Sequence, residues 1–212
     1  MFRQRVRIFF RKEGLLRFIS HHDLMRLFER ALRRAGLPLK LSEGFNPRPQ
    51  VSFPLALALG VESRAEIVEF ELTEWVSPRR VREKLERQLP EGIGISSGQS
   101  VAYGEKAEVV ASEFSVEMGT PPPDFEARLA AFMAAATVML ERSGKSAGKR
   151  LNVRSFVRAA HFDGKTLRLD LSVSPAGSVR PDEVIQAVLG RPLDDAAPLR
   201  ITRTRLDLSP PS

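Results

Sequence analysis

The chain has 212 residues, of which 42% are hydrophobic and 28% charged, values typical of globular proteins that argue against a disordered or fibrous chain. It contains no cysteine, which excludes disulfides and thiolate-bound metals or iron–sulfur clusters, and no apolar run of the roughly 18 residues that a membrane span needs. The net charge is +7 and uneven: residues 1–50 hold twelve Lys+Arg and four Asp+Glu, so they carry +8 and the remainder −1.

A localised basic region favours an anionic partner, because it concentrates polyanions and allows contact with phosphates. The N-terminal residues lack the apolar core of a signal peptide, so we expect a cytoplasmic protein that does not enter a membrane. The three histidines, His21, His22 and His161, are too few and too badly spaced for a zinc or iron site. We therefore expect no metal and no other cofactor.

The first predicted elements are a strand over residues 5–10 and a helix that begins after Ser20. Ser20 with Asp23 resembles a capping box, and Gly36 with Pro38 ends the helical pattern. The apolar positions of this helix are Leu24, Leu27, Phe28, Ala31 and Ala35. Its opposite face carries Arg26, Arg30, Arg33 and Arg34.

An extended segment, 39–41, and a loop with two prolines, 42–49, follow the helix. Residues 66–72 alternate between apolar and charged side chains, as a half-buried strand does. A second helix is predicted from Ser77 to Pro90, and a short strand at 93–95 completes this half.

The second half predicts the same order of elements. A strand at 114–118 precedes a helix from Pro123 to Arg142, and a hairpin follows with strands 151–162 and 166–173. A last helix, 180–190, leads to a final strand, 200–208. The order βαββαβ, found twice, predicts an α+β protein of two tandem ferredoxin-like domains: a basic domain at 1–105 and a second at 108–208.

The arginine face of the first helix, with Arg17 before it and Lys40 after it, is the first candidate site. Guanidinium groups match phosphate geometry, and a helix face can place several along a nucleic-acid backbone. A solvated charged face is the ordinary alternative, but Glu29 alone offsets the arginines locally.

The 42–49 loop is the second candidate, because it places Phe45, Asn46 and Arg48 together. An aromatic ring beside an amide and a guanidinium can stack on and hydrogen-bond an unpaired base. Phe45 packed into the core is an equally good interpretation of this pattern.

The hairpin of the second half is a third candidate, since Asn152, Arg154, Phe156 and Arg158 alternate along one strand face. Aromatic and arginine side chains on a sheet face are typical of single-stranded RNA platforms. Packing of Phe156 against the other domain is the somewhat better interpretation.

His21 or His22, next to Asp23, suggests a general base oriented by a carboxylate. The reaction would be metal-independent cleavage of RNA, as in the tandem ferredoxin-like endoribonucleases that process CRISPR repeats. No general acid or nucleophile accompanies these residues, and capping or packing is the commoner use of such histidines.

Three segments together resemble the radical SAM-associated domain of unknown function, a family found fused to B12-binding-type radical SAM proteins or as a separate small protein. They are residues 17–26, residues 30–38, and residues 42–49 with Ser52 and Phe53. The resemblance is dense over residues 5–75 and thinner later, where Arg154 and the helix start at 179–181 are similar. His22 stands where the family has an apolar residue and Arg48 where it has histidine, which weakens a catalytic use of either position.

The resemblance implies an association and no established reaction. Without cysteine the chain cannot hold the radical SAM cluster, so it would serve as an accessory to a protein that does. The family's gene neighbourhoods, beside ribonuclease E/G-type and ribosomal-protein genes, imply a role with RNA. We therefore expect a non-catalytic module that presents RNA, tRNA or rRNA, to a radical SAM or ribonuclease partner. The alternatives are the endoribonuclease and a protein–protein adaptor that binds no nucleic acid.

Overall fold

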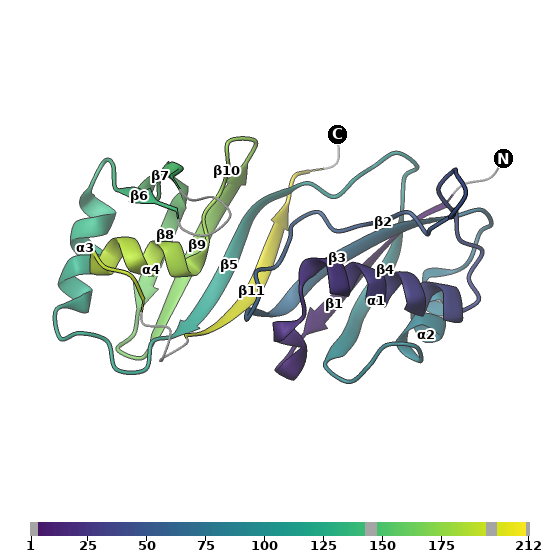
Figure 1. Cartoon of the computed structure of the whole chain (residues 1–212), viewed down its shortest axis with the longest axis horizontal. Helices are drawn as coiled ribbons and strands as arrows, with labels where there is room; N and C mark the ends of the chain where they lie inside the picture. The colour runs from purple at the N-terminus through teal and green to yellow at the C-terminus, as the bar shows by residue number, and fades with distance from the viewer. Residues whose placement is uncertain (1–3, 143–147, 194–198, 211–212) are drawn as a thin grey trace. The chain divides into compact units, whose positions relative to one another are not determined.

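The computed structural model has an α+β fold, as the helix and strand patterns of the sequence predicted (Figure 1). It describes residues 4–142, 148–193 and 199–210. The chain divides into two compact units. Unit 1 comprises Met1–Val109 with Leu208–Ser212, and unit 2 comprises Val110–Asp207.

Unit 1 is a sheet with two α-helices. Its elements are β1 (Gln4–Lys12), the 3-10 helix η1 (Gly14–Phe18), α1 (His21–Arg34), β2 (Val51–Ser52), β3 (Glu62–Leu72), α2 (Pro78–Glu86) and β4 (Ile93–Val101). β1 lies between β4 and β3, and β2 pairs with the other edge of β3. These pairs give the strand order β4-β1-β3-β2, and every pair is antiparallel.

The two helices of unit 1 cover one face of its sheet (Figure 1). The register pairs Val6 with Phe70 and Ile8 with Val68, which places apolar side chains together on that face. Phe28 of α1 meets Phe10 of β1 with ring centroids 4.8 Å apart. Burial of this apolar set, together with Val81 and Leu85 of α2, holds the helices on the sheet.

Unit 2 has a sheet of five strands, two α-helices and a small separate hairpin. Its elements are β5 (Val109–Glu117), α3 (Phe125–Ala134), β6 (Met139–Glu141), β7 (Arg150–Asn152), the 3-10 helix η3 (Arg154–Phe156), β8 (Val157–Phe162), β9 (Thr166–Ser174), β10 (Gly177–Ser178), α4 (Pro181–Leu189) and β11 (Arg200–Leu208). β9 pairs antiparallel with β5 on one side and with β8 and β10 on the other, and β11 follows β5.

Two predicted elements of unit 2 are wrong in extent. The helix predicted to reach Arg142 ends at Ala134, because the backbone is extended at Ala135 and residues 139–141 pair as β6 with β7. The β-branched Thr137 and Val138 favour this change to strand. The strand predicted over 151–162 is broken by η3 at Arg154–Phe156.

In the part of the chain that the structure describes, every helix is too short or too polar to serve as a membrane span.

Candidate nucleic-acid interface

Helix α1 begins at the predicted cap. The Ser20 hydroxyl accepts from the backbone N–H of Asp23 at 3.1 Å and donates to the Asp23 carboxylate at 2.7 Å. Because Leu24, Phe28 and Leu32 turn toward the sheet, the opposite face is exposed. The exposed face carries Arg26, Arg30, Arg33 and Arg34.

These four arginines differ in their contacts. Arg33 donates to the backbone oxygen of Pro47 at 2.6 Å, and Arg34 donates to that of Gln88 at 3.2 Å. Arg26 lies 4.0 Å from the Asp23 carboxylate with its side chain 68% exposed, an arrangement that solvent weakens. The side chain of Arg30 has no ion pair or hydrogen bond with any other residue that the structure describes.

The 42–49 loop is closed by its own backbone. The N–H of Ser42 donates to the oxygen of Arg48 at 2.8 Å, the N–H of Arg48 donates to the Ser42 hydroxyl at 3.1 Å, and Leu41 bridges to Pro49. Gly44 has φ +120°, a conformation that side chains strongly disfavour. Asn46 and Arg48 are exposed, and Phe45 is fully exposed at 105% of its reference surface.

The contact from Arg33 to Pro47 unites the first two candidate sites. The loop contacts α1 at Arg33, near the C-terminal end of the arginine face. The exposed residues of the two segments are Phe45, Asn46 and Arg48 of the loop and Arg26, Arg30 and Arg33 of the helix. We call these six residues the α1–loop surface.

Arg17 and Lys40 were predicted to reinforce this basic surface, but both are paired. Arg17 lies 3.4 Å from Glu62 and stacks over Phe18, and Lys40 donates to Glu71 at 2.7 Å. Both carboxylates come from β3, later in the chain than the first fifty residues. Part of the +8 surplus of that window is therefore compensated within unit 1.

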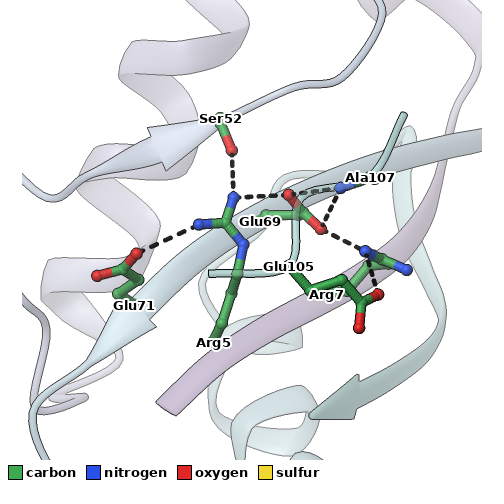
Figure 2. A network of polar contacts seen from close by, with 7 residues as sticks. All are labelled: Arg5, Arg7, Ser52, Glu69, Glu71, Glu105 and Ala107. Atoms are coloured by element: carbon green, nitrogen blue, oxygen red, sulfur yellow. Dashed lines mark hydrogen bonds and ion pairs between the residues drawn. The ribbon is translucent and has the colours of Figure 1, made fainter. Parts of the chain in front are cut away.

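The largest group of paired arginines and carboxylates in unit 1 is a buried network on the sheet face opposite the helices (Figure 2). Arg5 and Arg7 project there from β1, and Glu69 of β3, 2% exposed, accepts from both at 2.7 and 2.8 Å. Arg5 also donates to Glu71 and Ser52, and Arg7 to Glu105. The backbone N–H of Ala107 donates to Glu69 at 3.1 Å, so residues 105–107 are anchored to this face.

The environment of Glu69 favours its charged form. Burial alone would raise the pKa of Glu69, but hydrogen bonds from Arg5, Arg7 and Ala107 outweigh it and hold the pKa below its ordinary value. The alternation over residues 66–72 predicted a half-buried strand, but Glu69, on the charged side of that strand, is 2% exposed. The signal that could have revealed the network is the pair of arginines at the same alternation in β1.

The Asp23 carboxylate does not orient His21 or His22 as a general base. The Asp23 carboxylate bonds to Ser20, and among the described residues no hydrogen bond joins it to either imidazole. His21 packs edge-on against Phe53 with ring centroids 5.5 Å apart, and burial with the nearby His22 lowers the pKa of His21. Among the described residues, no three His, Asp or Glu side chains gather as a metal site would require.

Arg154 lies in unit 2, and its guanidinium is engaged with backbone. It donates to the oxygens of Met133 at 3.1 Å and Val157 at 2.7 Å, while Phe156 is buried at 8% exposure. The burial of Phe156 removes its ring from the exposed face that an RNA platform would need.

A second basic stripe, which was not predicted, lies on α2 and its C-cap. Arg80, Lys84 and the C-cap residue Arg87 recur at i, i+4 and i+7, and Lys84 donates to the backbone oxygen of Gly36 at 3.2 Å, just after α1. The exposed apolar side chains were also overlooked: Leu15, Phe18, Leu59 and Trp75 are 56 to 85% exposed.

A family model matches residues 5–181 of this chain. The chain belongs to that family, DUF2344, described as an uncharacterised protein conserved in bacteria. No curated protein matches it. It is also similar to a solved structure of an unknown protein from Galdieria sulphuraria, at 14% identity over 98% of this chain and 99% of the other, with a TM-score of 0.29. A likeness at that score supports no conclusion about the DUF2344 fold or function.

Proposed function

We propose that this DUF2344 protein binds RNA, tRNA or rRNA, through the α1–loop surface and acts as a non-catalytic accessory module. One observation carries the proposal: Phe45 is fully exposed on a closed loop that Arg33 ties to a face of exposed arginines. Exposed aromatic rings beside guanidinium groups are what single-stranded RNA sites use, because bases stack on the ring and phosphates pair with the cations.

The charges of unit 1 support this choice of surface. Residues 1–109 hold nineteen Lys+Arg and fourteen Asp+Glu, a surplus of +5. Arg5, Arg7, Arg17 and Lys40 are paired with carboxylates, so they add little field outside the molecule. The remaining surplus includes Arg30, Arg33 and Arg48, where a polyanion can reach it.

We further propose that both units are ferredoxin-like domains. In unit 1 the chain order βαββαβ goes with the strand order β4-β1-β3-β2, and in unit 2 the equivalent strands follow β11-β5-β9-β8. Both orders agree with the split βαβ arrangement of that fold.

The partner that we propose is a radical SAM protein or a ribonuclease. A group of exposed apolar side chains, Leu15, Phe18 and Leu59, offers a surface for a protein. The N–H of Gly60 donates to the oxygen of Arg17 at 2.8 Å, which brings residue 59 close to η1. The same apolar group favours a protein–protein adaptor as the second candidate function.

Fluorescence anisotropy of labelled tRNA, an rRNA fragment and single-stranded RNA tests the proposal. The variant R26E/R30E/R33E should lose RNA binding and keep its circular dichroism spectrum. The matched control R64E/R150E/R168E removes the same charge from exposed arginines outside the α1–loop surface and should retain most of the affinity. Equal affinity of the two variants would refute the α1–loop surface, and the recovery of a protein without RNA in a pull-down would favour the adaptor.

A further inference from the structure

Trp75 is an exposed aromatic residue that none of the sites above includes. It is the only tryptophan of the chain, it lies in the turn between β3 and α2, and it is 64% exposed. An indole is usually kept from water by packing, since its large apolar surface stabilises the fold only when it is buried. Its exposure here marks a surface available to a ligand.

Backbone contacts place this turn next to the start of the 42–49 loop. The N–H of Thr73 donates to the oxygen of Pro38 at 2.8 Å, Leu39 bridges to Leu72, and the N–H of Lys40 donates to the oxygen of Glu71 at 2.9 Å. The segment 38–41 therefore runs beside 71–73, two residues before Trp75, and leads directly into the loop that carries Phe45. The 42–49 loop and the turn after β3, the two segments that carry these aromatic residues, lie at the end of the unit 1 sheet where β3 ends (Figure 1).

Cationic side chains accompany both rings. Arg48 is exposed in the loop, and Arg79 and Arg80 are exposed in the first turn of α2. Glu74 is the carboxylate beside Trp75, and Glu83 pairs with Arg79 at 2.9 Å, so Arg48 and Arg80 are the cations here without a carboxylate partner among the described residues. Two exposed rings with exposed guanidinium groups match the chemistry of single-stranded nucleic acid, whose bases need a π face and whose phosphates need a cation.

We propose that Trp75 and Phe45 are stacking positions for unpaired bases, so that the segment of RNA held at this end of unit 1 is single-stranded. The inference rests on the proposed RNA binding and adds the class of substrate to it. A paired base offers no free face to an indole, whereas every unpaired base does, which predicts preference for single strands with little dependence on sequence.

The fluorescence of Trp75 tests this directly, because no other tryptophan contributes. The intact protein is titrated with a ten-nucleotide oligoadenylate and, separately, with a blunt RNA duplex of matched total charge. Stacking predicts that the oligoadenylate quenches the emission and that the duplex does not. Anisotropy that reports binding of the labelled oligoadenylate without any quenching would overturn the inference.

Variants give a second, independent measurement. Since stacking on one aromatic side chain contributes about 1–3 kcal/mol per base, W75A should weaken binding of the oligoadenylate by about 5- to 150-fold. W75F keeps a ring and should lose less. F18A is the matched control, because Phe18 is also exposed but lies in η1, after β1, at the other end of the sheet. Equal affinities of W75A, F18A and the wild type would contradict the inference.

The outcomes separate this inference from the proposed function. If R26E/R30E/R33E abolishes RNA binding while W75A has no effect, the α1–loop surface stands and the stacking role of Trp75 fails. If the arginine variant binds normally while the oligoadenylate quenches Trp75, single-strand stacking stands and the α1–loop surface fails.

Discussion

Replacing Glu69 with glutamine tests the buried network of unit 1. The substitution keeps the shape of the side chain but removes the charge that Arg5 and Arg7 share, and both arginine side chains are at most 7% exposed. Breaking a buried ion pair costs about 3–5 kcal/mol, because a charge is left without its partner. Arg5 keeps Glu71 at 3.2 Å and Arg7 keeps Glu105 at 3.1 Å, so we expect a loss of about 3 kcal/mol in the free energy of unfolding, the lower end of that range.

Hydrogen exchange of the β1 amides measures this loss in unit 1 separately from unit 2. The control E83Q removes a carboxylate that is also hydrogen-bonded to an arginine, but at the surface, and should leave the exchange of β1 unchanged. A loss below about 1 kcal/mol for E69Q, the size expected of an exposed pair, would refute the reasoning.

Protonation of the Glu69 carboxylate should make the stability of unit 1 depend on pH. Folding lowers the pKa of Glu69, so its charged form stabilises unit 1 above the ordinary pKa near 4.5. This stabilisation is lost as the pH falls toward the pKa that Glu69 has in the folded protein. Below about pH 4.5, the stability of unit 1 should therefore fall more steeply in the wild type than in E69Q, measured by the same exchange. Parallel curves for the two proteins would contradict the assignment.

Three further predictions concern single side chains. Burial lowers the pKa of His21, so its NMR titration midpoint should lie below 6.5, and H21Q should reduce the loss of stability as the pH falls through this range; a midpoint above 6.5 contradicts it. R33A should speed hydrogen exchange at the Ser42 amide, because the loop loses its hydrogen bond to α1. R30A removes no side-chain hydrogen bond or ion pair among the described residues and should leave this exchange unchanged. R154A should destabilise unit 2 by about 2 kcal/mol in urea unfolding, because two hydrogen bonds to backbone oxygens are lost. RNA affinity should not change. Weaker RNA binding by a folded R154A variant would show that Arg154 takes part in RNA binding.

The order of helices and strands could be predicted because it depends on local periodicity and caps. Ser20 and Asp23 cap α1, and Pro78 follows the cap of α2, as the sequence indicated. The error at residues 135–142 arose where pairing between β6 and β7, a contact with a segment later in the chain, determines the structure.

The candidate site was predictable in part for the same reason. The exposure of Arg26 and Arg30 follows from the helical period, so it can be predicted from the sequence of this helix alone. The pairing of Arg17 with Glu62 and of Lys40 with Glu71, and the burial of Arg5 and Arg7, depend on which strands become neighbours. Charge counted along the sequence therefore overestimated the basic surface, and the contact of Arg33 with Pro47 could not be foreseen from either segment alone.

The salt dependence of tRNA binding tests the central claim most directly, because the slope of log affinity against log salt counts phosphate contacts. The comparison is wild type against R26A/R30A, which removes two exposed arginines that hold no other element in place. RNA binding by the α1–loop surface predicts weaker binding by the variant and a slope smaller by roughly two, about one for each lost phosphate contact. An unchanged affinity and slope would contradict RNA binding by the α1–loop surface.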